Sequence, residues 1–270
     1  MSEVMKQNND GRRIGWVLGA PIDALTWTDA LARLTTWGAA RESRYVCICN
    51  VHSVVTARES AFGRVLNEAD LCTPDGAPVA WMLRRLGFVG QDRINGPDLM
   101  WKYLAVAEAR GQVVSFYGGS DATLGILLER IRAAFPRIHI GVAISPPFRA
   151  LTVEEDAVDV KRINDCGTAV LFVGLGCPKQ ETWMMNHRGQ VFSVMVGVGA
   201  AFDYHAGTIQ RAPLWMQRSG LEWLHRLASE PRRLWRRYLV TNSIFMMQAA
   251  RQLLWPARQG PAVKDRGAER

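Results

Sequence analysis

The sequence lacks the features that mark several common protein classes. Its longest nearly uncharged apolar run, residues 191–202, has twelve residues, whereas a membrane-spanning helix needs about 20. Residues 1–13 are polar, so no signal peptide is expected. The five cysteines are odd in number and form no Cys-x-x-Cys pair, which disfavours a disulfide framework and a zinc site. These absences favour a cytoplasmic protein with reduced thiols.

Three motifs of nucleotide and metal chemistry are also missing. The segments GGSDATLG and VGLGCPKQ look loosely like dinucleotide-binding turns, but neither fits Gly-x-Gly-x-x-Gly and neither follows the first strand. The chain has no phosphate-binding loop of the form Gly-x-x-x-x-Gly-Lys-Ser/Thr. It also has no Asp-x-Asp, the metal-binding signature of many sugar transferases. A dehydrogenase, a nucleoside triphosphatase and a metal-dependent transferase are therefore disfavoured.

Positive charge is concentrated at one end of the chain. The net charge is +8 over 270 residues. Residues 211–270 hold 12 basic and 4 acidic side chains, whereas the remaining 210 residues hold 21 of each. The whole excess therefore belongs to the C-terminal segment. This asymmetry predicts a neutral body with an attached basic element that meets an anionic partner.

Strand-like and helix-like segments alternate through the body. Each of the short runs RYVCICN, VVSFYGG, IHIGVAI, AVLFVGLG and VFSVMVGVGAAFD is rich in Val, Ile and Phe and is typical of a buried strand. The segments DATLGILLERIRAAF and VEEDAVDVKRIND have helical period. The alternation predicts an α/β, Rossmann-like layered fold with a mostly parallel sheet. The expected organisation is a disordered N-terminus (1–13), an α/β core (14–210), a basic helical appendage (211–256) and a disordered tail (257–270).

Glycines close several of the predicted strands. One strand ends at Gly118 and Gly119, and Ser120 follows as a residue suited to begin a helix. Another strand ends near Gly176, and Pro178 follows as a candidate first helical residue. Ligands of open α/β sheets bind at the carboxyl ends of strands, where glycines admit a phosphate and helix N-termini offer free N–H groups. Both turns are therefore candidate nucleotide contacts.

Asp75 is the candidate catalytic carboxylate. It stands in LCTPDGAPVAW between a proline and a glycine, which is ordinary turn chemistry. Apolar residues on both sides and a position at a strand end also suit a general base that takes a proton from a substrate hydroxyl. The residues of this stretch alone leave both interpretations open.

The order of several motifs along the chain helps to decide between these two interpretations of Asp75. They are CNVHS (49–53), ADLCTPDG (69–76), DRINGPDL (92–99), FYGG (116–119), VGLGCPKQE (173–181), GVGAAFDYHAGTIQRAP (197–213) and GLEWLHRLASEPRRLWRRYL (220–239). As an ordered set they resemble the WecG/TagA/CpsF family of bacterial glycosyltransferases. The resemblance runs from about Ile14 to about Leu254, nearly the whole chain.

The resemblance implies an activity and a site. Such enzymes move a sugar from a UDP-sugar to a polyprenyl-diphosphate-linked sugar, with inversion, at the cytoplasmic face of the inner membrane. It places the general base at Asp75 and pocket-lining side chains at Gln180 and Asp203. The full expected substrate-binding set is Asn50, His52, Gly76, Gly118, Gly119, Gly176, Lys179, Gln180, Asp203, Arg226, Arg233 and Arg236. Family members use glucose, N-acetylmannosamine or its uronic acid, and overall similarity favours an exopolysaccharide, xanthan-type glucosyltransferase.

Several residues near these motifs have simpler interpretations. His52 is more often structural than a ligand contact when it stands alone, and Asp203 suits a turn after a strand. Arg93 and Asn95 are best explained as shaping a loop. With no Asp-x-Asp, the leaving UDP is expected to be stabilised by arginines and helix N-termini. No metal and no cofactor are therefore expected.

The basic segment EPRRLWRRYLVTNSIFMMQAARQLLW has apolar residues at helical spacing, among them Leu234, Phe245 and Trp255. This pattern predicts an amphipathic helix on an anionic membrane surface. Two alternatives are a helix that packs on the body with a solvated basic face and an element that binds RNA. Nucleic acid is the less favoured partner, and a homo-oligomer stays open. The alternative for the whole chain is a nucleotide-binding α/β protein with an RNA- or lipid-binding tail and no transferase activity.

Overall fold

A single parallel sheet forms the centre of the protein. The structure, a computed structural model, describes residues 11–255 apart from the side chains of Arg218, Arg233 and Arg237. The sheet has six strands in the spatial order β4-β3-β8-β7-β5-β6. They are β3 (Arg44–Cys49), β4 (Leu71–Pro74), β5 (Val113–Gly118), β6 (His139–Ile144), β7 (Val170–Gly174) and β8 (Val194–Gly197). This sheet, with helices between its strands, confirms the expected α/β layered fold.

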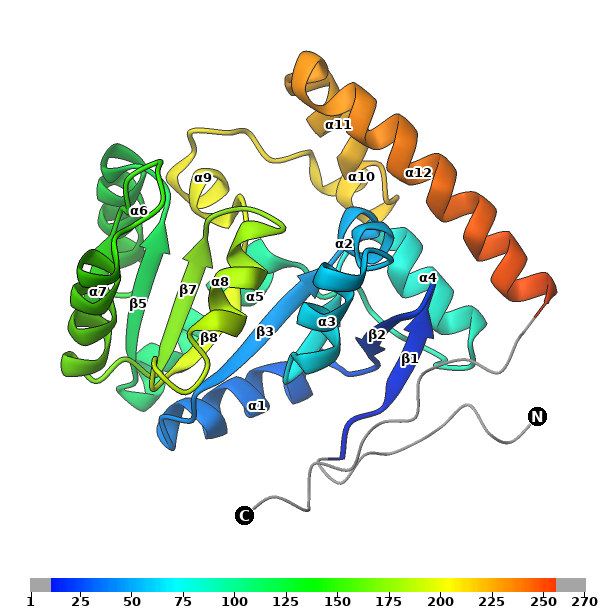
Figure 1. Cartoon of the computed structure of the whole chain (residues 1–270). Helices are drawn as coiled ribbons and strands as arrows, with labels where there is room; N and C mark the ends of the chain where they lie inside the picture. Colours follow the sequence, from blue (N-terminus) through cyan, green and yellow to red (C-terminus); the bar gives the residue numbers. More distant parts are fainter. Residues whose placement is uncertain (1–10, 256–270) are drawn as a thin grey trace.

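Helices cover both faces of the sheet (Figure 1). Those of the described chain are α1 (Trp27–Ala39), α2 (Val51–Thr56), α3 (Ser60–Glu68), α4 (Ala77–Arg85), α5 (Gly96–Arg110), α6 (Asp121–Ala134), α7 (Val153–Asp165), α8 (Lys179–Asn186), α9 (Ala201–Ala206), α10 (Leu214–Arg218), α11 (Glu222–Ser229) and α12 (Pro231–Leu254). Helices α1, α5, α6 and α9 share one hydrophobic cluster with the sheet, and α3, α7 and α8 share the other. The two segments of helical period became α6 and α7, as predicted, and Ser120 caps α6.

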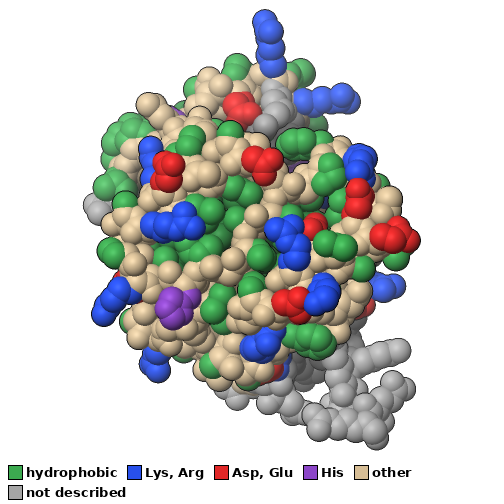
Figure 2. Space-filling view, turned by 90° about the vertical axis from the view of Figure 1, so that its left-hand side faces the viewer, with side chains coloured by type: hydrophobic (Ala, Val, Ile, Leu, Met, Phe, Trp, Pro, Cys, Tyr) green, Lys and Arg blue, Asp and Glu red, His purple; other side chains and the backbone are tan. Residues whose placement is uncertain are grey.

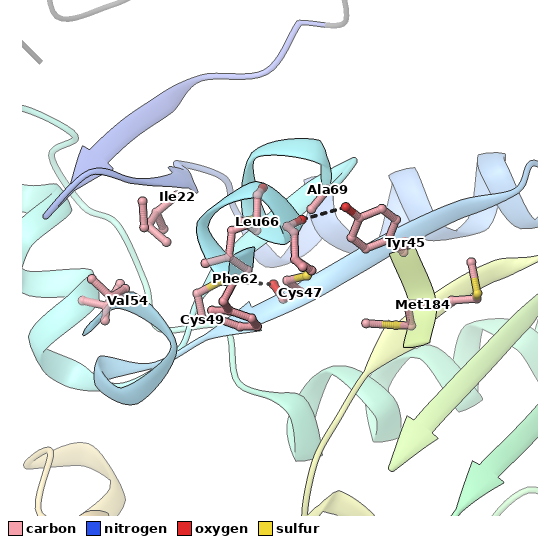
Figure 3. Packing of buried hydrophobic residues seen from close by; sticks show 14 of the residues in the cluster. Ile22, Tyr45, Cys47, Cys49, Val54, Phe62, Leu66, Ala69 and Met184 are labelled. Atoms are coloured by element: carbon pink, nitrogen blue, oxygen red, sulfur yellow. Dashed lines mark hydrogen bonds between the residues drawn. The ribbon is translucent and has the colours of Figure 1, made fainter. Parts of the chain in front are cut away.

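Strand alternation divides the core between these two faces. On β3, Tyr45, Cys47 and Cys49 face the cluster with α3 and α8, because successive strand residues point to opposite sides. The Tyr45 hydroxyl donates to the carbonyl of Val65 at 2.7 Å. Figure 3 shows the two cysteines of β3 beside Phe62 of α3. Both thiols are buried and free, so the two cysteines pack as small apolar groups on one face of the strand.

The last predicted strand was too long. Only Val194–Gly197 of the run 191–203 pairs in the sheet, as β8. Gly199 takes a φ of +59°, and the chain then turns into α9, so Asp203 lies in a helix and does not end a strand. Glycine tolerates the left-handed conformation that this turn needs. The apolar pattern alone does not separate a buried strand from the short buried helix that follows it.

A small hairpin precedes the sheet. It pairs β1 (Ile14–Val17) with β2 (Ala20–Asp23) in antiparallel register. Arg12 is ion-paired to Asp23, with 2.7 Å between Nη2 and Oδ2, and the carbonyl of Arg13 accepts from the backbone of Ala24. A buried carboxylate therefore holds Arg12, which belongs to the segment 1–13 that was expected to be disordered, against the hairpin. The rest of that segment, residues 1–10, and the expected tail at 257–270 lie outside the described residues.

The strand order places the candidate site at the carboxyl edge of the sheet. All five pairs of neighbouring strands in this sheet are parallel. All six strands end at one edge, toward which the arrowheads in Figure 1 point and beside which α9 lies. Strands β4 and β5 are separated by three others, so their ends lie about 19 Å apart at the usual strand spacing. The site is therefore extended along this edge.

Helices α10, α11 and α12 form the C-terminal appendage. Leu234 and Phe245 of α12 are buried, and Phe245 belongs to the core cluster of α3 and α8. The Gln252 amide donates to the carbonyl of Trp16 at 2.6 Å and accepts from the backbone of Leu18 at 2.9 Å. The helix therefore packs on the body along one side. Within residues 11–255, no helix is long and apolar enough to cross a membrane.

The body surface is mixed in charge. Figure 2 shows acidic and basic side chains interspersed over the face that carries α6 and α7. Ion pairs on this part of the chain include Arg149 with Glu155 and Lys161 with Asp165. This mixture agrees with a body whose basic and acidic residues balance, in contrast to the appendage.

Candidate active site

Asp75 lies immediately after β4 at the carboxyl edge. Its backbone N–H donates to the carbonyl of Cys49 on β3 at 2.9 Å. Gly76 follows with a φ of +84°, a conformation that favours glycine, and is the N-cap residue of α4. The Asp75 side chain is 18% exposed, and its Oδ1 accepts from Nε of Arg93 at 3.0 Å. The carboxylate is thus ion-paired and partly buried, and more than a residue of an exposed turn.

The contact of Arg93 with Asp75 was not predicted from the sequence. Nε of Arg93 contacts Asp75, and its Nη2 lies 2.6 Å from Oε2 of Glu222 on α11. Burial lowers the pKa of Arg93, but the charges of Asp75 and Glu222 outweigh burial and raise the pKa overall. The available signal was its place in DRINGPDL, one of the motifs of the resemblance. The loop-shaping role of Arg93 therefore stays a prediction, to which the structure adds an ion pair with Asp75.

A second ion pair adjoins the first. Arg211 contacts Asp98, with 3.0 Å between Nη2 and Oδ2, and its Nε lies 3.6 Å from Oε1 of Glu222. Burial raises the pKa of Asp98, but hydrogen bonds from Arg211 and Asn95 outweigh burial and lower it. Asn95 caps α5 by accepting from the backbone N–H of Asp98 at 3.0 Å. Asn95 therefore has a local structural role as the cap of α5.

Asn50 and His52 lie on the neighbouring strand end. The Asn50 side chain caps α2 and accepts from the backbone N–H of Ser53 at 3.1 Å. His52 is half-buried in α2, with Nδ1 3.5 Å from the hydroxyl of Thr56. Both therefore have local structural contacts, and their predicted contact with substrate stays a prediction.

The glycine turns after β5 and β7 meet each other. Gly118 pairs with Gly174 in the sheet register and has a φ of +117°. A Cβ at Gly118 would lie 2.6 Å from the Gly174 carbonyl oxygen, and one at Gly174 would lie 2.7 Å from the ring of Phe202. Gly119 follows with a φ of +73°, and its carbonyl accepts from the Ser145 hydroxyl at 2.8 Å. These glycines allow two strand ends to approach closely at the edge where a ligand is expected.

Gln180 joins the turns that follow β7 and β8. Its Oε1 accepts from the backbone N–H groups of Gly176 and Gly199, both at 3.1 Å. Its Nε2 donates to Glu181 at 2.9 Å. Gln180 is 3% exposed, so in this structure it holds two glycine turns and does not present its amide to solvent. The neighbouring Lys179 is exposed at the start of α8.

Glu181 is a buried carboxylate in the first turn of α8. It is 1% exposed, and its Oε2 lacks a hydrogen-bond partner within the described residues. Burial raises the pKa of Glu181, although the hydrogen bond from Gln180 opposes that shift. Because Glu181 accepts from Nε2, it orients the Gln180 amide so that Oε1 faces the two turns.

Asp203 and Arg226 come from α9 and α11. Asp203 is half-buried, and its Oδ1 accepts from the Thr208 hydroxyl at 3.2 Å. The Arg226 guanidinium lies over the ring of Tyr204, 5.9 Å from its centroid. Its Nε is buried and has no hydrogen-bond partner in the described chain. Arg226 therefore offers an unused donor beside the helix that carries Asp203.

The two other arginines of the expected set lie on α12. Arg236 is exposed. The backbone of Arg233 belongs to the same helix, but its side chain lies outside the described part of the chain. Only Arg226 of the three therefore has a described contact with the body, through Tyr204.

The arrangement combines a carboxylate with cationic groups. A partly buried carboxylate at a strand end suits proton removal from a hydroxyl. Arginines from the core and from α11 suit stabilisation of a phosphate-bearing group. Such a combination at the carboxyl edge of an α/β sheet is compatible with group transfer from a nucleotide.

Comparison with known proteins identifies the family. Residues 16–259 match the model of the WecG/TagA/CpsF glycosyl transferase family. The match covers most of the chain, so the protein belongs to this family of glycosyltransferases. The resemblance drawn from the ordered motifs is confirmed.

Several relatives carry one name, N-acetylglucosaminyldiphosphoundecaprenol N-acetyl-beta-D-mannosaminyltransferase. A protein of Bacillus spizizenii is 31% identical over 230 residues, which cover 81% of this chain and 86% of the relative. A protein of Bacillus subtilis is 33% identical over 177 residues, covering 65% and 66%. A protein of Staphylococcus aureus is 28% identical over 239 residues, covering 87% and 91%. Their shared name is that of a mannosaminyltransferase, which corrects the expected xanthan-type glucosyltransferase branch.

Proposed function

We propose that the protein transfers N-acetylmannosamine from its UDP-sugar to an N-acetylglucosaminyl-diphospho-undecaprenol. The shared name of the relatives, at about 30% identity, supports both the transferred sugar and the acceptor. The ion pair of Asp75 with Arg93 at the carboxyl edge supports the chemistry. That pair is the observation that carries the proposal.

The proposed reaction is a single displacement at the anomeric carbon. The acceptor hydroxyl gives its proton to Asp75 while its oxygen forms a bond to the anomeric carbon. The bond between that carbon and the UDP oxygen breaks, and UDP leaves with the electron pair. Asp75 suits this role because Arg93 contacts its Oδ1 alone, which leaves Oδ2 for the proton. Attack from the side opposite UDP inverts the anomeric centre.

Arginines are proposed to stabilise the leaving diphosphate without a metal. The buried Nε of Arg226 has no hydrogen-bond partner among the described residues, and guanidinium groups match phosphate geometry. We assign Arg233 and Arg236 the same role when α12 meets the substrate. The remaining proposed contacts of the nucleotide sugar are Asn50, His52, Gly76, Gly118, Gly119, Gly176, Lys179 and Asp203, while Gln180 acts through the turns that it holds.

UDP release tests this function. Purified protein is supplied with a panel of UDP-sugars and with N-acetylglucosaminyl-diphospho-undecaprenol in detergent. We expect acceptor-dependent UDP release from UDP-N-acetylmannosamine and an unchanged rate when a chelator is added. Release from another donor instead would show that the proposed donor sugar is wrong. Strict dependence on magnesium or manganese would refute the arginine-assisted departure of UDP. No release with any donor would contradict the transferase and favour the nucleotide-binding alternative.

The outer face of α12 is proposed to contact the membrane. Its exposed apolar residues repeat at helical spacing, with Trp235, Leu239 and Met246 on one row and Val240, Met247 and Leu254 on the next. Arg232, Arg236 and Arg251 are exposed among them. Apolar side chains mixed with arginines suit an anionic lipid surface. Leu234 and Phe245, expected on this face, instead pack on the body.

Vesicle binding tests this surface. We expect Trp235→Ser with Leu239→Ser to weaken co-sedimentation with phosphatidylglycerol vesicles about tenfold, because both side chains lose contact with the acyl region. Phe192→Ser is the control, since Phe192 is an exposed aromatic of the body. Binding to RNA with no affinity for vesicles would refute the membrane role and support a nucleic-acid partner. These data would also test the proposed peripheral location at the cytoplasmic membrane face.

A further inference from the structure

Helix α11 begins against the turn that carries Asp75. Gly220, two residues before the helix, has a φ of +73°, and a Cβ there would lie 2.6 Å from the Cβ of Ala77. Ala77 is the first residue of α4, two positions after Asp75. The close approach therefore requires a glycine and brings the N-terminus of α11 to the proposed base.

Glu222, the first residue of α11, contacts two arginines at this point. Its Oε2 lies 2.6 Å from Nη2 of Arg93, and its Oε1 lies 3.6 Å from Nε of Arg211. Arg93 contacts Asp75, and Arg211 contacts Asp98. The result is an alternating series of carboxylates and guanidinium groups. The Glu222 side chain is 15% exposed, so water screens these contacts less than it would on an open surface.

The geometry at Arg93 has a consequence for Asp75. A guanidinium group binds one carboxylate through two nitrogens when nothing prevents it. Here Nε contacts Oδ1 of Asp75, while Nη2 is held by Glu222. Without Glu222, Arg93 is able to turn and engage both oxygens of Asp75, which would cover the atom that must accept the proton.

We propose that Glu222 is a positioning residue, which holds Arg93 so that only Oδ1 of Asp75 is occupied and Oδ2 stays open to the acceptor hydroxyl. The inference rests on the proposed function, because it concerns the same base. With this arrangement, Asp75 is able to accept the proton only when α11 is docked. Glu222 itself takes no part in bond making or proton transfer.

A kinetic double-mutant cycle between Glu222 and Arg93 tests this role. We expect Glu222→Ala to lower kcat about ten- to a hundredfold, the scale of a misplaced catalytic group, with the donor KM changed less than about twofold. In an Arg93→Lys background, where no fork can engage both oxygens, Glu222→Ala is expected to change kcat by less than about twofold. Glu222→Gln keeps an acceptor oxygen and should retain more activity than the alanine variant.

Glu230→Ala is the matched control, because Glu230 is an acidic residue of the same appendage at the start of α12. We expect its kcat to equal that of the wild type. Thermal unfolding of every variant shows whether a loss of rate comes from unfolding. Multiplicative losses in the cycle, a change confined to KM, or full activity of both Glu222 variants would overturn the inference. An inactive wild type would instead overturn the proposed function, and the inference with it.

Discussion

Asp75→Asn is expected to lower kcat for sugar transfer by about a thousandfold, within the usual range for removal of a general base. An asparagine keeps an oxygen that can accept from Nε of Arg93, so the ion-paired turn should keep its shape. It has no basicity with which to take the proton of the acceptor hydroxyl. Acceptor-dependent UDP release measures the loss, and the donor KM should change little.

The control for this substitution is Asp121→Asn. Asp121 is an exposed carboxylate in the first turn of α6, at the same edge of the sheet. We expect it to keep the wild-type rate, apart from a small loss of helix stability. UDP release by Asp75→Asn at the wild-type rate would leave the protein a glycosyltransferase by family but would remove Asp75 from the role of base.

Gly118→Ala is expected to lower the free energy of unfolding by about 2–4 kcal/mol, combining backbone strain with overpacking. Gly118 has a φ of +117°, where residues with a side chain are strained. The added Cβ would meet the carbonyl of Gly174 at 2.6 Å. That carbonyl belongs to the neighbouring strand and cannot move without disturbing the pairing of β5 with β7. Denaturant unfolding followed by circular dichroism measures the change.

Gly125→Ala is the matched control for this loss. Gly125 lies within α6, is exposed and has nothing within 4 Å of an added Cβ. Alanine there is expected to raise the free energy of unfolding by about 0.5–1 kcal/mol, because glycine weakens a helix interior. Equal stability of Gly118→Ala and the wild type would show that the two strand ends separate easily.

Local sequence patterns were sufficient to predict most strands of the sheet and several of its helices. The runs that became β3, β5, β6 and β7 are rich in branched and aromatic residues, and α6 and α7 follow good capping residues. The pattern failed where β8 passes into α9, because both are short, apolar and buried. It also did not mark the strands β1 and β2, whose four residues each are too few for a clear period.

In the appendage, too, the sequence pattern predicted the helix but not which of its faces packs on the body. Its basic character and helical period predicted one long helix, and α12 spans Pro231–Leu254. Which apolar face of α12 points outward was not predictable, because the body-facing side and the outer side both carry large apolar residues. Contact with the core buries Leu234 and Phe245, so Trp235 and Leu239 remain exposed.

By itself, the sequence determined the α/β class, the strand-end position of Asp75 and the family. These features depend on residues close together in the chain or on the order of motifs along it. Only the tertiary structure decided that Arg93 binds Asp75, that Glu222 of α11 binds Arg93, and that Gln180 faces two backbone turns. The physical reason is that these ion pairs and buried hydrogen bonds form between segments that are distant in the sequence. Local periodicity reports only which face a side chain occupies, and not which distant segment it contacts.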